Sequence, residues 1–171
     1  RLKPDLRYFK KKTIGNGNNA IVMGKKTWLS LPQSNHTYNF LPKRDNIILS
    51  NQVKGTKNTK GALDGIFLSS IREMKKYCKD KQFEEVWIIG GESLYKQTMK
   101  DNDLQKIYVT NIDKNYEVDT YFPSIPDNFS LLSSSPSLSE RDITYQYQVY
   151  KRMGSVSDIN KLYTLFPRYG G

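Results

Sequence analysis

The chain has 171 residues, of which 37% are hydrophobic and 26% are charged, a composition typical of one globular domain and not of a disordered segment. Its formal net charge is +10, but the basic residues are scattered and many alternate with acids. Three interpretations of the charge stay open: a solvated surface, a polyanionic small ligand and a nucleic acid. Aromatic and basic residues do not interleave as in RNA-binding modules, so a nucleic-acid partner is disfavoured. No signal peptide is visible and no apolar run is long enough to cross a bilayer, so no membrane partner is expected.

Cysteine and histidine are too scarce for several kinds of site. The chain has one cysteine, Cys78, and one histidine, His36, so an internal disulfide and a His/Cys zinc site are excluded, and no metal site is predicted. Cys78 falls in a helical pattern, where packing is favoured over reactivity, and His36 falls in a polar loop. A reducing compartment is expected, the cytoplasm in the first place with the mitochondrion as the alternative.

Short apolar runs alternate with helical patterns along most of the chain, which is the layout of an open, mostly parallel α/β sheet with helices on its faces. Residues 129–134 and 143–150 instead alternate apolar and polar side chains, which predicts an antiparallel pair at the C-terminal edge. Parallel strands are predicted at residues 20–23, 46–50, 66–68, 85–89 and 106–112, and helices at about 5–13, 25–30, 70–79 and 93–99.

Sheets of this kind bind ligands beyond the carboxyl ends of their strands. Gly90 and Gly91 end one strand just before a helix, an arrangement that suits either a phosphate or a plain strand–helix turn. Gly24 ends another strand, and Lys25, Lys26 and Thr27 follow it at a helix start. Lysines are not favoured there by the helix dipole, so a bound anion and a solvated lysine pair compete as explanations.

Asp5 is the only acid between Leu2 and Ile14, and it lies beside Leu6 and Phe9 on the apolar face of the first predicted helix. An N-terminal helix position explains an aspartate by capping alone. A carboxylate on an apolar helix face beside a cleft suits a second role, in which it orients and helps to protonate a substrate. Both interpretations stay open on the residues alone.

Five segments resemble those of the dihydrofolate reductase family, in the family's order and at compatible spacing. The first contains Gly24-Lys25-Lys26-Thr27-Trp28, a form closer to eukaryotic than to bacterial members, and the third contains the pair Gly90-Gly91. The resemblance implies NADPH-dependent reduction of 7,8-dihydrofolate to tetrahydrofolate in support of one-carbon and thymidylate synthesis, with antifolates as further ligands. The segments are residues 21–32, 41–50, 86–95, 107–112 and 119–123.

The resemblance assigns substrate-site roles by position. Asp5 matches the acid that binds the pterin edge and promotes protonation at N5, and Thr110 matches the hydroxyl that supports this acid. Arg44 matches the arginine that holds the glutamate α-carboxylate of folate, a bidentate task suited to a guanidinium. The walls of the substrate cleft correspond to Leu6, Phe9, Ser30, Leu31, Leu41 and Ile89.

The same comparison assigns the cofactor site. Gly24, Lys25 and Thr27 match the turn over the phosphates and the nicotinamide side of NADPH. Lys25, Ser50 and Asn51 lie where the family holds the adenosine 2′-phosphate. The pair Gly90-Gly91 corresponds to a cis peptide bond in the family. The pyrophosphate turn and its helix correspond to Gly90, Gly91, Glu92, Ser93, Leu94 and Tyr95.

Two departures from the family pattern limit the resemblance. The predicted reductase-like domain comprises residues 1–153. Its N-terminal part has no counterpart of the family's first strand, which is central in the sheet, or of the loop after that strand. Without this first strand, two strands of the sheet have unpaired edges, unless upstream residues or another segment fill the gap. Residues 154–171 are predicted to be a linker or tail, which suggests a fused or associated thymidylate synthase. Two other functions therefore stay open: a catalytically inactive, reductase-like structural subunit, and a basic nucleic-acid-binding module.

Overall fold

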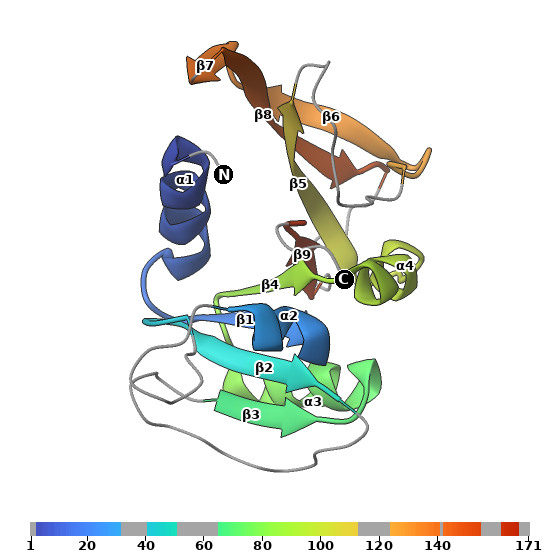
Figure 1. Ribbon diagram of the computed structural model, residues 1–171. Helices are drawn as coiled ribbons and strands as arrows, with labels where there is room; N and C mark the ends of the chain where they lie inside the picture. Colours follow the sequence, from blue (N-terminus) through green and yellow to red (C-terminus); the bar gives the residue numbers. More distant parts are fainter. Residues whose placement is uncertain are drawn as a thin grey trace.

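The fold is built on one twisted sheet that combines a parallel part and an antiparallel part (Figure 1). The computed structural model describes residues 3–31, 41–50, 65–112, 124–140, 142–154 and 162–167. Within these ranges the strand order is β3-β2-β1-β4-β9-β5-β8-β6, and β7 pairs with β8. Every pairing from β3 to β5 is parallel, and every pairing of β8 is antiparallel.

The predicted parallel strands, β1 to β5, are interspersed with helices along the described part of the chain. The elements in chain order are α1 (Lys3–Ile14), β1 (Asn19–Gly24), α2 (Lys25–Ser30), β2 (Asp45–Leu49), β3 (Gly65–Leu68), α3 (Ile71–Lys81), β4 (Glu85–Gly90), α4 (Glu92–Met99), β5 (Leu104–Ile112), β6 (Phe129–Ser134), β7 (Leu138–Glu140), β8 (Ile143–Arg152) and β9 (Tyr163–Leu165).

The predicted fold class and element order are confirmed. β1 pairs in parallel with β4, so the apolar runs at residues 20–23 and 86–89 lie in the same sheet. β6 and β8 form the antiparallel pair expected at the C-terminal edge. Ser70 caps α3 by accepting a hydrogen bond from the amide of Glu73 at 3.1 Å.

β9 is the main difference from the sequence-based expectation, which treated residues 154–171 as a linker or tail. Tyr163–Leu165 instead lies between β4 and β5 and pairs in parallel with both. The segment therefore occupies the central position for which the N-terminal part of the chain offered no strand. β7, a short strand inside the connection between β6 and β8, was not predicted either.

The turn after α1 fixes this helix against the sheet. Gly15 has a φ of +53°, and a Cβ at this position would lie 2.7 Å from Nδ2 of Asn19, so both conformation and space require glycine. The buried Asn19 donates to the carbonyl of Thr13 and accepts from the amide of Glu85, each at 3.0 Å. One side chain thus joins the end of α1 to the starts of β1 and β4.

The sheet separates two apolar clusters. One contains Cys78 and Met74 of α3 together with residues of α4 and of alternate strand positions. The other, here called the α1-side cluster, contains Phe9, Ile21, Met23, Leu31, Ile48, Phe67, Trp87, Ile89 and Phe166, with Tyr8, Trp28, Leu41 and Tyr108 packed against it.

Cys78 is a packing residue in this structure. Its side chain is buried, and burial together with the charge of Asp45 raises the pKa of the Cys78 thiol to about 12. A thiol with that pKa carries almost no thiolate at neutral pH, which confirms packing over reactivity. In the part of the chain that is described, no helix is both long and apolar enough to span a membrane.

Candidate functional site

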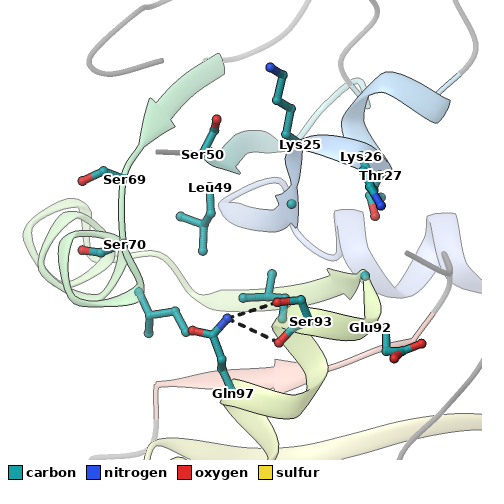
Figure 2. A pocket seen from close by; sticks show the side chains of 14 residues that line it. Lys25, Lys26, Thr27, Leu49, Ser50, Ser69, Ser70, Glu92, Ser93 and Gln97 are labelled. Atoms are coloured by element: carbon teal, nitrogen blue, oxygen red, sulfur yellow. Dashed lines mark hydrogen bonds between the residues drawn. The ribbon is translucent and has the colours of Figure 1, made fainter. Parts of the chain in front are cut away.

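A cavity of about 500 Å³ opens at the carboxyl edge of the parallel strands (Figure 2). Its walls come from the residues that follow β1, β2, β3 and β4, as expected for an open α/β sheet. Eight residues predicted for the cofactor site line it: Gly24, Lys25, Thr27, Ser50, Gly91, Glu92, Ser93 and Leu94. The sheet therefore brings together positions from four separate segments of the chain.

Hydroxyl groups and two lysines give the cavity its polar character. Figure 2 shows Ser50, Ser69 and Ser70 on one side, with Lys25 and Lys26 at the start of α2. Gln97 lies across the cavity, where its Nε2 donates to the carbonyl of Ser93 at 3.3 Å. The lysines and hydroxyls suit a ligand that carries negative charge and hydrogen-bonding groups.

The Thr27 hydroxyl is a buried polar group of the cavity wall that a polar ligand could satisfy. Thr27 is buried and lines the cavity, and its Oγ1 has no hydrogen-bond partner among the described residues. An unsatisfied buried hydroxyl is costly, whereas a ligand oxygen or amide in the cavity would satisfy it. The residues present therefore fit a phosphorylated dinucleotide.

Two helix starts contribute further donors. α3 begins next to Ser69 and Ser70, and α4 begins at Glu92 directly after Gly91. The first amides of a helix lack intrahelical partners and carry the positive end of its dipole, so both starts favour an anion. The peptide bond between Gly90 and Gly91 is cis, in agreement with the family resemblance.

Tyr95 supports the packing of α4 and does not line the cavity. It is buried, and its hydroxyl donates to the carbonyl of Ile89 at 2.7 Å. This contact ties α4 to the end of β4. Gly90 likewise contributes the turn rather than a cavity wall, and Asn51 lies outside the described residues.

The residues predicted as substrate-cleft walls gather on the α1 side of the sheet. Phe9, Leu31, Leu41 and Ile89 all belong to the α1-side cluster or pack against it. Leu6 and Ser30 are exposed and do not belong to this cluster, and Ser30 donates to the carbonyl of Thr27 at 2.7 Å. The cluster shares β4 with the cavity, because Ile89 directly precedes the cis glycine pair.

Arg44 is buried near the end of α1, and its guanidinium is hydrogen-bonded to the protein itself. Its Nε donates to the carbonyl of Pro42 at 2.9 Å, and one terminal nitrogen donates to Oγ1 of Thr13 at 2.8 Å. The Asn46 side chain fixes the same loop through bonds to the amide and carbonyl of Leu41 and to the carbonyl of Arg44. A fixed guanidinium suits recognition of a carboxylate, the role that the resemblance gives it.

The predicted acid and its supporting hydroxyl come from neighbouring elements. Asp5 lies in the first turns of α1, although its side chain is outside what the structure describes. Tyr8, one turn further along, stacks on Tyr147 with ring centroids 3.9 Å apart. Tyr147 is the cross-strand partner of Thr110. The helix that carries Asp5 is therefore packed against the strand pair that carries Thr110.

Tyr108 contributes a neutral phenol to the same region. Burial, with smaller contributions from Tyr8 and Glu85, raises the pKa of Tyr108 to about 12, so its hydroxyl stays protonated at neutral pH. The sequence pattern did not point to Tyr108, nor to the cavity residues Leu49, Ser69, Ser70, Ile71 and Gln97. Ser69 and Ser70 lie directly after β3, so the rule that located the other cavity residues also applies to them.

Comparison with known proteins identifies the relatives of this chain. Residues 1–152 match the family model described as dihydrofolate reductase. The chain is 32% identical to dihydrofolate reductase of Aedes albopictus, over 90% of this chain and 86% of that protein. It is also 32% identical to dihydrofolate reductase of Sus scrofa, over 88% of this chain and 85% of that protein. A viral dihydrofolate reductase of Saimiriine herpesvirus 2 is 32% identical, over 87% of this chain and 73% of that protein.

Proposed function

Because the chain belongs to the dihydrofolate reductase family, we propose that it catalyses hydride transfer from NADPH to C6 of 7,8-dihydrofolate, with a proton added at N5. The products are tetrahydrofolate and NADP⁺, and the tetrahydrofolate supports one-carbon transfer and thymidylate synthesis. The observation that carries this proposal is the adjacency of two unlike sites along β4. A polar cavity lies at one side of the cis glycine pair, and an apolar cluster begins at Ile89 on the other.

The two sites bind different ligands. NADPH, when bound, supplies the hydride. The cavity residues hold its phosphates through Lys25, the serine hydroxyls and the starts of α3 and α4. The apolar cluster holds the substrate ring and excludes water from the place of reaction, while Arg44 would bind a carboxylate at the substrate's tail.

The direct test is dihydrofolate-dependent oxidation of NADPH by the full-length protein, followed by absorbance, together with equilibrium binding of each ligand. We expect turnover and competition by antifolates that mimic the substrate ring. A protein that binds NADPH and dihydrofolate without turnover would fit an inactive structural subunit instead. A protein that binds neither ligand but binds RNA in a salt-sensitive way would fit the basic nucleic-acid-binding module.

Lys25 is proposed to read the 2′-phosphate that distinguishes NADPH from NADH. Replacing Lys25 by Ala should weaken NADPH binding more than NADH binding, by roughly 1–3 kcal/mol for a charge-assisted hydrogen bond. The measurement is the dissociation constant of each cofactor for wild type and variant. Lys79→Ala is the matched control, because it removes the same charge from an exposed position of α3 that does not line the cavity. Equal losses for both cofactors in Lys25→Ala would show that Lys25 does not select the phosphate.

Asp5 is proposed to bind the pterin edge and to favour the protonated substrate. Asp5→Asn keeps the size and the capping ability of the side chain, so α1 should survive. Hydride transfer at neutral pH should fall by roughly 10²–10⁴-fold, the range of acid–base assistance. Lowering the pH should partly restore the rate, because solvent then protonates the substrate.

A pH–rate profile of Asp5→Asn beside wild type tests this role. Asp127→Asn, which alters an exposed acid in the turn before β6, serves as the control and should leave the profile unchanged. Near-normal activity of Asp5→Asn at neutral pH would reduce Asp5 to a helix cap.

A further inference from the structure

β9 is held in the sheet at both of its ends. The amides of Leu162 and Tyr163 donate to the carbonyl of Asp103 at 2.9 and 3.2 Å, just before β5. The amide of Phe166 donates to the carbonyl of Ile88 in β4 at 2.8 Å. The segment lies beyond residue 152, where the match to the family model ends. This part of the chain thus supplies the strand between β4 and β5.

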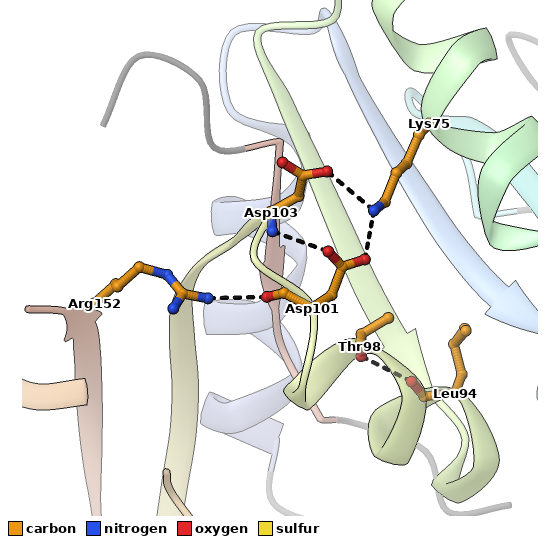
Figure 3. A network of polar contacts seen from close by, with 6 residues as sticks. All are labelled: Lys75, Leu94, Thr98, Asp101, Asp103 and Arg152. Carbon is orange, nitrogen blue, oxygen red and sulfur yellow. Dashed lines mark hydrogen bonds and ion pairs between the residues drawn. The ribbon is translucent and has the colours of Figure 1, made fainter. Parts of the chain in front are cut away.

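A polar network fixes the place where β9 enters (Figure 3). Lys75 contacts Asp101 at 2.6 Å and Asp103 at 3.0 Å. Arg152 donates to the carbonyls of Leu104 and Asp101, both at 2.9 Å. Burial opposes ionisation of Asp101, but hydrogen bonds from Lys75 and from the amide of Asp103 outweigh it and lower the pKa of Asp101. Charged side chains and their hydrogen bonds therefore hold the turn next to β9 in place.

Phe166 projects to the α1 side of the sheet, whereas Tyr163 and Leu165 belong to the opposite cluster. Its ring meets that of Phe9 edge to face at 5.1 Å and stacks on Tyr108 at 5.4 Å. It also lies 5.8 Å from Trp87. An aromatic ring from the C-terminal segment thus packs among residues of α1, β4 and β5.

The site around Phe166 is closed. Phe166 is 1% exposed, Ile89 0%, Leu31 3% and Phe9 4%, so the predicted cleft walls are covered by protein and not by solvent. A substrate ring that contacts the face of Phe9 on which Phe166 packs must first displace the Phe166 ring. Trp87 in the same cluster is also buried, and its Nε1 has no hydrogen-bond partner among the described residues. A heterocycle offers acceptors to this donor that a phenylalanine ring lacks.

We propose that Phe166 controls access to the substrate-ring site, because its buried ring packs edge to face on Phe9, a residue assigned to the wall of that site. Binding of dihydrofolate then requires that the Phe166 side chain leave the α1-side cluster. This inference rests on the proposed function, which places the substrate on that side of the sheet. Phe166 is accordingly a specificity-determining residue that competes with ligands that contain a ring.

The competition lowers the apparent affinity for dihydrofolate, because only molecules in which Phe166 has left the site can bind it. Burial of a phenylalanine side chain favours the closed arrangement by roughly ten- to a hundredfold. Removal of the ring should therefore tighten dihydrofolate binding by a factor of that order, while binding of NADPH in the neighbouring cavity should change little.

The experiment measures dissociation constants of dihydrofolate and NADPH for Phe166→Ala, Phe166→Leu and Leu165→Ala in the full chain. Leu165→Ala is the matched control, since it empties a buried position of the same strand on the opposite face. We expect tighter dihydrofolate binding and a lower KM in Phe166→Ala, a smaller effect in Phe166→Leu, and no tightening in Leu165→Ala. Phe166→Leu keeps an apolar side chain in the core, so the comparison survives if Phe166→Ala fails to fold.

Dihydrofolate binding by wild type separates the competition by Phe166 from the proposed function. If wild type and variants all bind dihydrofolate and neither Phe166 variant binds it more tightly than Leu165→Ala does, the competition is wrong and the proposed function stands. If neither wild type nor any variant binds dihydrofolate, the proposed function fails, and the competition fails with it.

Discussion

The backbone pairing of β9 with β4 on one side and β5 on the other joins the two parts of the sheet. β3, β2, β1 and β4 form one part, and β5, β8 and β6 form the other. Without a strand at this position, the amides and carbonyls along the facing edges of β4 and β5 would lack partners in the middle of the protein, which is costly. The relative placement of α1, Thr110 and the polar cavity follows from this pairing.

The two proposed ligand sites depend on the same strand position in different ways. The polar cavity is formed by segments that follow β1 to β4, so it needs only one part of the sheet. The α1-side cluster combines Phe9, Ile89, Tyr108 and Phe166, and therefore needs both parts and β9 between them. Cofactor binding should consequently tolerate changes in β9 that alter the substrate site.

Most of the fold could be predicted because local patterns and tertiary structure agree. β1 and β4 each end at a glycine, Gly24 and Gly90, and a helix follows closely. The order of these strands predicts which residues meet at the sheet edge. β9 could not be predicted in this way, since a three-residue strand has no measurable period and its partners lie far away in sequence. Its pairing is a tertiary effect: an apolar segment enters a slot whose edges need hydrogen bonds. The burial of Phe166 in the α1-side cluster could not be predicted for the same reason.

Hydrogen exchange of the Phe166 amide in the ligand-free protein tests the central claim, that β9 completes the sheet, most directly. The amide donates to the carbonyl of Ile88 at 2.8 Å, so the account predicts protection close to that of amides in β1 and β4, which open only on global unfolding. Exchange at the rate of an unstructured amide, while β1 and β4 stay protected, would contradict it.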